Sequence, residues 1–208
     1  MRSYRIGVLA LAALLSTSLA HATLIEGTPT PYDTSPANPL PRFGTLIDFD
    51  DGTTYDALAP DRYVGEGVTS IENLLGPTLA FYPTSQSAPN YIGTGPAVGW
   101  NADILVEFSS LQAAVGIGIA GPTTLLFELL DASMNPLESY NISTTPTNTY
   151  YYINRLSNDT KFLHVKGDFI AIDDLQFDTQ TVGAVPEPGT LALMLAGLGA
   201  VRRFRRRP

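Results

Sequence analysis

Aspartates at two places in the sequence have the residue type and spacing to bind a hard cation. Asp48, Asp50 and Asp51 lie close together, and Asp173 and Asp174 are adjacent near the end of a β-rich stretch. Calcium takes about six to eight oxygen ligands, which carboxylates and backbone carbonyls supply. If the strands that hold these aspartates are neighbours, we predict calcium bound by Asp50 or Asp51 together with one of Asp173 or Asp174. Strand alternation would point Asp173 and Asp174 to opposite faces, so at most one of them could join the site. The competing interpretation is that all of them are solvated turn and edge residues.

A tyrosine triplet could provide a stacking platform for sugars. In a strand, alternation places Tyr150 and Tyr152 on one face and the tyrosine between them on the other. Sugar rings pack their apolar C–H faces on aromatic rings, with polar side chains holding the hydroxyls. We predict a carbohydrate site that includes Trp100, Tyr150 and Tyr152, with Tyr82 or Tyr91 nearby. The alternative is that these rings belong to the core.

The sequence offers little for catalysis. It has no cysteine, and its two histidines are His21, in a leader-like segment, and His164, in a strand-like pattern without a G-x-S-x-G motif. Residues 116–121 fit the letters GxGxxG, but Pro122 and another β-type run follow where a nucleotide-binding helix would begin. A glycosidase needs only two suitably spaced carboxylates, so a hydrolase stays open as an alternative. We predict that the protein is not an enzyme.

Charge separates the chain into three parts. Residues 23–185 contain 5 basic and 19 acidic residues, a net charge of 5 − 19 = −14, whereas arginines concentrate at both ends. Because phosphate binding needs clustered Lys and Arg, this acidic middle is not expected to bind nucleic acid or anionic lipid. The 18 glycines, 16 prolines and low charged fraction of 15% favour a folded, turn-rich β protein.

The first 22 residues have the organisation of a signal peptide. Two arginines precede an apolar run, which is too short for a membrane span and ends in Ala20-His21-Ala22. We predict cleavage after Ala22 by signal peptidase, so that the mature chain begins at Thr23. Residues 23–42 contain five prolines and predict an extended spacer.

The last residues, 185–208, combine three elements in a fixed order. They are a Pro186-Glu187-Pro188 tripeptide, an apolar segment expected to be helical over 190–201, and an arginine cluster at 202–207 (Arg202, Arg203, Arg205, Arg206 and Arg207). The apolar helix would be about 18 Å long. It would insert transiently into the inner membrane, and its arginines would stop transfer and stay cytoplasmic.

This order of elements resembles the PEP-CTERM sorting signal. The resemblance implies recognition by an exosortase, a membrane transpeptidase-like enzyme, with the body on the periplasmic side of the inner membrane before processing. It further implies delivery to the cell surface or beyond in a Gram-negative bacterium that makes exopolysaccharide and biofilm matrix. The tail indicates a route, not the role of the delivered domain.

The region 43–180 predicts an all-β antiparallel sandwich. Short β-type runs alternate with turn residues, which is typical of a sandwich or barrel. The expected strands are 44–49, 63–72, 78–83, 90–94, 103–109, 113–120, 123–131, 136–143, 149–156, 161–166 and 169–177. Their order resembles exported jelly rolls of the galactose-binding-like or concanavalin-like kind.

Three functions follow as hypotheses. The first is a non-enzymatic surface or extracellular-matrix protein, sorted by an exosortase and associated with exopolysaccharide. The second is a calcium-dependent carbohydrate-binding protein, and the third is a secreted polysaccharide hydrolase.

Overall fold

The computed structural model describes residues 24–27, 43–83, 89–95, 100–121, 124–143 and 149–179. The predictions for the signal peptide, including Ala20 and Ala22, and for the tail from residue 180 lie outside these residues. Within the described part, no helix is long and apolar enough to cross a membrane.

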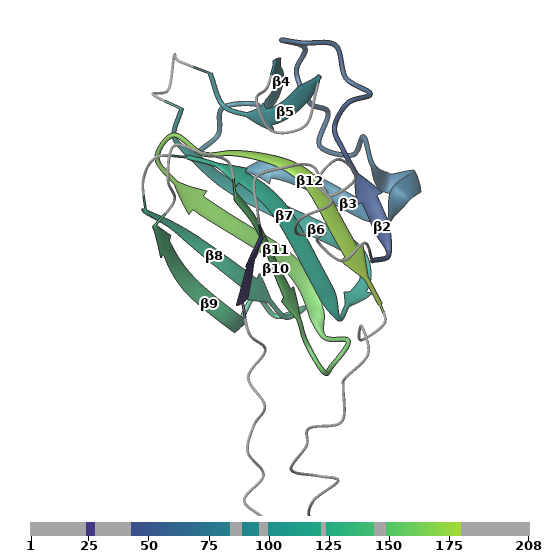
Figure 1. Ribbon diagram of the computed structural model, residues 1–208. Coiled ribbons are helices and arrows are strands. Elements are labelled where there is room, and N and C mark those ends of the chain that lie inside the picture. The colour runs from purple at the N-terminus through teal and green to yellow at the C-terminus, as the bar shows by residue number, and fades with distance from the viewer. Residues whose placement is uncertain are drawn as a thin grey trace, which may run out of the picture.

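Two antiparallel sheets form the body (Figure 1). Sheet A is seven-stranded and contains, in spatial order, β1 (Leu24–Gly27), β10 (Thr149–Asn154), β7 (Ala114–Ala120), β12 (Ala171–Asp178), β5 (Asn90–Gly93) and β4 (Ala80–Pro83), with β2 (Thr45–Ile47) also paired to β12. Sheet B is five-stranded and contains β3 (Val68–Asn73), β6 (Ala102–Gln112), β11 (Thr160–Gly167), β8 (Thr124–Leu130) and β9 (Pro136–Ser143). The predicted antiparallel β-sandwich is therefore confirmed.

The core lies between the two sheets. Strand alternation directs Ile104 and Val106 of β6 and Ile117 and Ile119 of β7 inward, and all four are fully buried. The chain crosses from β6 in sheet B to β7 in sheet A through a single residue, Ala113, which is also buried. Each crossing of this kind ties the two layers to one core.

The structure departs from the expected elements at two places. Leu24–Gly27 lies in the predicted spacer but pairs with β10, because this stretch precedes the first proline of the segment and can donate a full ladder. The strand expected from residue 63 begins only at Val68, since a 3-10 turn, η1 (Val64–Glu66), comes first. Gly67, with φ of 100°, ends that turn in a conformation that favours glycine.

The β4–β5 hairpin lies at one end of the sandwich, above the two sheets in Figure 1. It joins the body at the start of β12, where Ala171 pairs with Gly93 of β5. The other end of β12, Asp178, lies beside Ala114 at the start of β7. The hairpin and the exit of the chain toward its C-terminal tail are therefore at opposite ends of β12.

Candidate functional site

Two tyrosines face each other across the β4–β5 hairpin. Phe81 and its register partner Ile92 are fully buried, so alternation turns the neighbouring pair, Tyr82 and Tyr91, to the other face. Tyr82 and Tyr91 are direct cross-strand partners, and their rings stack at 5.8 Å with an interplanar angle of 27°. The buried pair anchors the hairpin, and the outward pair begins an aromatic surface.

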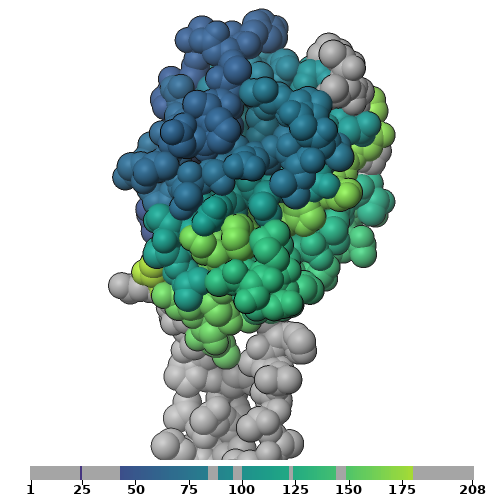
Figure 2. Space-filling view, turned by 180° about the vertical axis from the view of Figure 1, so that it is seen from behind, coloured from purple at the N-terminus to yellow at the C-terminus, as the bar shows by residue number. Residues whose placement is uncertain are grey.

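Two further rings complete this surface, one from the loop after β2 and one from the segment that follows β5. Trp100 contacts Tyr82 edge to face at 5.2 Å, and Tyr55 contacts Tyr82 edge to face at 5.8 Å. Tyr82 is thus the centre of a group of four rings, which we call the aromatic cluster (Tyr55, Tyr82, Tyr91 and Trp100). Tyr55 is 70% exposed, and the other three rings are half-buried. In Figure 2, the blue segment that begins at residue 43 covers the upper end of the molecule.

Two of these rings belong to residues with a positive φ. Tyr55 has φ of 73° and Trp100 has φ of 62°, which is unfavourable for bulky side chains. The Tyr55 N–H donates to the carbonyl of Phe81 at 2.6 Å, and this bond fixes the loop beside β4. Gly95 leaves room for the Tyr82 hydroxyl, since a Cβ there would lie 2.7 Å from it. Strain of this kind concentrates at functional sites.

Asn90 fastens the preceding loop to the hairpin. Its backbone N–H donates to Asp50 at 3.0 Å, its side-chain amide donates to the Gly52 carbonyl at 2.8 Å, and its Oδ1 accepts from the Thr54 hydroxyl. Asn90 is buried, so these bonds are shielded from water. They position Tyr55, the residue after Thr54, against β4 and β5.

The cluster is apolar in its rings and polar at its edges. Partial burial raises the pKa of the Tyr91 phenol, and the nearby hydroxyls of Tyr82 and Tyr55 raise it further. The Tyr91 hydroxyl therefore stays protonated at neutral pH and can donate as well as accept hydrogen bonds. Flat rings with neutral hydroxyl groups suit a ligand that has apolar faces and hydroxyls of its own.

The structure separates Trp100 from the tyrosine triplet. Tyr150 and Tyr152 lie on β10, and β7 and β12 stand between β10 and the β4–β5 hairpin. Tyr150 is buried, and its hydroxyl accepts from the amide of Gln176. Burial is the main reason why its pKa is raised. Tyr152 is half-buried and packs on Phe43 at 5.8 Å. Trp100 thus belongs to a group with Tyr82 and Tyr91, whereas the triplet lies on β10, on the other side of β7 and β12 in the same sheet.

The aspartates predicted to bind calcium are placed on neighbouring segments. The strand before Asp50 pairs with β12, which carries Asp173 and Asp174. Asp51 accepts from Arg62 and Tyr63, and Asp173 is fully buried and accepts from the Asp174 N–H. Among the described residues, no group of three or more His, Asp or Glu side chains is arranged to hold a metal ion. Calcium binding by these aspartates stays a prediction.

A bulge in β12 changes the faces expected for its two aspartates. Opposite β7, Asp173 pairs with Gly118, but Gln176 pairs with Gly116, so β12 has one extra residue. Asp174 lies in the bulge with φ of 49°. The assumption of strict alternation between Asp173 and Asp174 is therefore wrong.

His164 lies in a polar network on the outer face of sheet B. Its Nδ1 is 2.9 Å from Glu128 and its Nε2 is 2.6 Å from Asp103, each on a neighbouring strand. Burial opposes ionisation of Asp103, but bonds from Lys166 and His164 outweigh it and lower the Asp103 pKa. Ser139 donates to Glu128 rather than to His164, so the described residues form no serine–histidine pair here.

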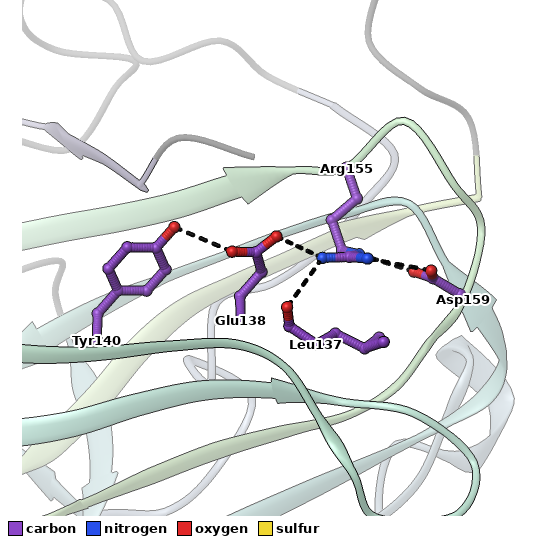
Figure 3. Close-up of polar contacts among 5 residues, drawn as sticks. All are labelled: Leu137, Glu138, Tyr140, Arg155 and Asp159. Carbon is purple, nitrogen blue, oxygen red and sulfur yellow. Dashed lines mark hydrogen bonds and ion pairs between the residues drawn. The ribbon is translucent and has the colours of Figure 1, made fainter. Parts of the chain in front are cut away.

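A second polar network surrounds Arg155, after β10 (Figure 3). Its guanidinium binds Glu138 on β9 and Asp159 in the following turn, and it also donates to the Leu137 carbonyl. Tyr140 donates to the other oxygen of Glu138. Glu138 is only 8% exposed, so its charge depends on this pairing. The network fastens the β10–β11 turn to sheet B.

Comparison with known proteins locates the sorting signal. The model of the PEP-CTERM protein-sorting motif matches residues 184–207. The match covers the predicted sorting residues Pro186, Glu187 and Pro188 and the arginines at 202, 203, 205, 206 and 207, all outside the described residues. The chain therefore carries a PEP-CTERM sorting motif, which implies an exported exosortase substrate with a C-terminal membrane-anchoring signal. No curated protein matches the chain.

Several solved structures are similar to the body at low identity. The K2 cleaved adhesin domain of Lys-gingipain is 12% identical, with a TM-score of 0.44, over 64% of this chain and 96% of that domain. A variant of a family 29 carbohydrate-binding module is 13% identical, with a TM-score of 0.42, over 70% of this chain and 99% of that module. A module from Clostridium stercorarium in complex with cellobiose is 11% identical, with a TM-score of 0.33, over 66% and 95%.

Tyr55 is the member of the cluster that sequence analysis missed. It lies outside every expected strand, in a Thr-Thr-Tyr-Asp stretch after an Asp-Gly turn. Neither alternation nor a motif marks it, and only the strained loop brings it to Tyr82. Tyr82 and Tyr91 were detectable, because each alternates with a core residue in a short strand.

Proposed function

We propose that this protein is a non-enzymatic surface or extracellular-matrix protein whose β-sandwich binds polysaccharide through the aromatic cluster. One observation carries the proposal: four rings from three separate segments converge around Tyr82, and the most exposed, Tyr55, is 70% accessible. Single exposed hydrophobic side chains are common on soluble proteins, but a contiguous group of accessible aromatic rings favours a binding surface. Rings with neutral hydroxyls match the alternating apolar and hydroxyl surfaces of sugars.

The location of the cluster supports this proposal. The chain leaves β12 at Asp178 toward the sorting motif, and the hairpin joins the start of the same strand at Ala171. Seven residue steps of extended strand separate these two points by about 23 Å. While the C-terminal signal holds the protein at the membrane, the cluster would face away from it, toward matrix polysaccharide.

The delivery route forms part of the proposal. After signal-peptidase cleavage, an exosortase would process the tail near Pro186–Pro188 and release the body to the surface or the biofilm matrix of a Gram-negative host. We also propose that the sandwich is a jelly roll, because the chain repeatedly crosses between sheets from β6 onward. Deleting residues 186–208 should change the protein's destination and leave the body folded. Identical sorting and size in a host with an exosortase would contradict the route.

Binding is tested by calorimetry of the full-length chain against a panel of neutral oligosaccharides and amino-sugar oligosaccharides. We expect saturable binding that Tyr82→Ala abolishes or strongly weakens and Tyr152→Ala leaves unchanged. Binding lost equally in both variants would place the site elsewhere. Release of reducing ends from any of these polymers would favour the hydrolase instead. Repeating thermal melts in chelator and in excess calcium tests the calcium-dependent alternative, which predicts a higher midpoint with calcium.

A further inference from the structure

The loop that carries Tyr55 gives the aromatic cluster a negative border. Residues 48–62 contain five acidic residues and one arginine, a net charge of 1 − 5 = −4 (Asp48, Asp50, Asp51, Asp56, Asp61 and Arg62). Asp56 directly follows Tyr55 and is exposed. Asp50 binds the N–H of Asn90, the residue before Tyr91. We call this loop the acidic border.

The charges in the acidic border repel one another. Burial is the main cause that raises the pKa of Asp50, and the nearby charges of Asp48 and Asp51 raise it further, against the hydrogen bond from Asn90. A cation placed near the loop would relieve this repulsion.

The one cation within this loop, Arg62, is already paired with a carboxylate of the same loop. The Arg62 guanidinium binds the Asp51 carboxylate at 3.0 Å and donates to the Asp51 carbonyl at 2.8 Å. It also lies 5.1 Å from the centre of the Phe81 ring. Arg62 therefore neutralises Asp51 within the loop and is not positioned to bind an acidic group of a ligand.

Within the part of the chain that the structure describes, no other lysine or arginine is free to replace it. The sequence contains no lysine, arginine or histidine between Arg62 and Arg155, a stretch that includes β4, β5 and Trp100. The other lysines and arginines of the described residues, Arg155, Lys161 and Lys166, are each paired with a carboxylate. A uronate or sulfate group at the cluster would meet acids and no free cation.

We propose that the aromatic cluster and its acidic border bind a polysaccharide that carries protonated amino groups, and that they exclude uronate and sulfate polymers. This inference rests on the proposed function and adds the charge class of its ligand. Sugar rings stack on Tyr82 and its neighbours, and the ammonium groups along the polymer lie against the carboxylates of residues 48–61. Ammonium groups also interact favourably with the faces of tyrosine and tryptophan rings. Like charges repel an anionic polymer from the same surface.

The test compares three oligosaccharides of equal length on the full-length chain at low and high salt. They are a glucosamine oligomer at mildly acidic pH, its fully N-acetylated counterpart and a galacturonate oligomer. We expect the glucosamine oligomer to bind about tenfold more tightly than the acetylated one at low salt, and the difference to shrink at high salt because exposed charges are screened. The galacturonate oligomer should not bind.

Two variants locate the effect. Asp56→Asn should lower affinity for the glucosamine oligomer about threefold and leave the acetylated oligomer unaffected, whereas Glu72→Gln, on the exposed face of β3, should change neither. Equal binding of the amino and acetylated oligomers, or binding of galacturonate, would overturn the charge preference and leave the proposed function standing. Binding of no oligosaccharide in the wider panel would overturn the proposed function itself.

Discussion

The aromatic cluster and the polar networks of sheet B lie on different surfaces of the same sandwich. The networks pair each charged group with a partner, whereas the cluster leaves aromatic rings accessible to solvent. Around Arg155 and His164, each charged group meets a charge or donor from a neighbouring segment. In the aromatic cluster, one exposed and three half-buried rings pack on one another, and two of them, Tyr55 and Trp100, have a positive φ. Satisfied networks stabilise the fold, whereas the positive-φ residues and the aromatic surface around Tyr82 are the features on which the proposed binding function rests.

The largest expected effect is a loss of stability when the Arg155 network is removed. Replacing Arg155 with Met removes the partner of buried Glu138 and should lower the free energy of unfolding by about 3 kcal/mol. Urea unfolding measures the loss, and oligosaccharide affinity below the transition should stay at the wild-type value. Arg155→Lys serves as the control and should recover part of the stability. A loss under about 1 kcal/mol would mean that the network is not a structural clamp.

The next largest effect is a loss of oligosaccharide affinity when the aromatic cluster is disrupted. Tyr82→Ala removes the central ring of the cluster and should weaken oligosaccharide binding about thirtyfold, or roughly 2 kcal/mol. Calorimetry checks the affinity, and circular dichroism checks that the sheets persist. The matched control is Tyr152→Ala, another half-buried tyrosine of sheet A. Unchanged affinity in the Tyr82 variant would show that the aromatic cluster is not the oligosaccharide-binding site.

A pH series sharpens the role of the His164 network. The Asp103 pKa is lowered in the folded state, so its stabilising effect is present above the ordinary value of 3.8 and is lost as pH falls through the folded-state pKa. Asp103→Asn should therefore cost about 1.5 kcal/mol near neutral pH. The deficit should close progressively in acid. If the loss in free energy of unfolding does not vary with pH, its cause is altered packing and not the lost charge of Asp103.

The smallest expected effect is that of Tyr55→Gly, which should raise stability and weaken oligosaccharide binding. Tyr55 has a positive φ, so Tyr55→Gly relieves backbone strain and should raise the free energy of unfolding by about 0.5 kcal/mol. The same change removes the most exposed ring and should weaken oligosaccharide binding. Thermal melts and calorimetry on one preparation measure both. A variant that is less stable, or one that binds as tightly as wild type, would show that the strain is not kept for binding.

The sequence predicted the sandwich well because its signal is local. Runs such as Ile104 and Val106 in β6 alternate with polar residues, and this pattern alone determines which face is buried. The pairing of β2 with β12 meets the condition that the calcium hypothesis set for the first and last strands. What failed was the assumption of strict alternation in β12, because nothing in the sequence of Asp173–Gln176 marks a bulge.

The candidate site was only partly predictable. Trp100, Tyr82 and Tyr91 were recognised as sugar-binding types, but the prediction grouped Trp100 with Tyr150 and Tyr152 instead of with its nearer neighbours in sequence, Tyr82 and Tyr91. Their convergence depends on a hairpin register and on Tyr55, whose loop is held by Asn90 from a distant part of the chain. Contacts between segments of this kind leave no periodic trace in the sequence.

The chain contains one tryptophan, Trp100, which lies in the aromatic cluster and reports on it directly. The decisive measurement is the tryptophan emission of the full-length chain during titration with a glucosamine oligomer, with Tyr82→Ala alongside. The account predicts a saturable change in intensity and wavelength for the wild type, at the affinity that calorimetry gives, and for the variant a change that requires about thirtyfold more oligomer. Calorimetric binding with unaltered Trp100 emission, or the absence of binding altogether, would contradict it.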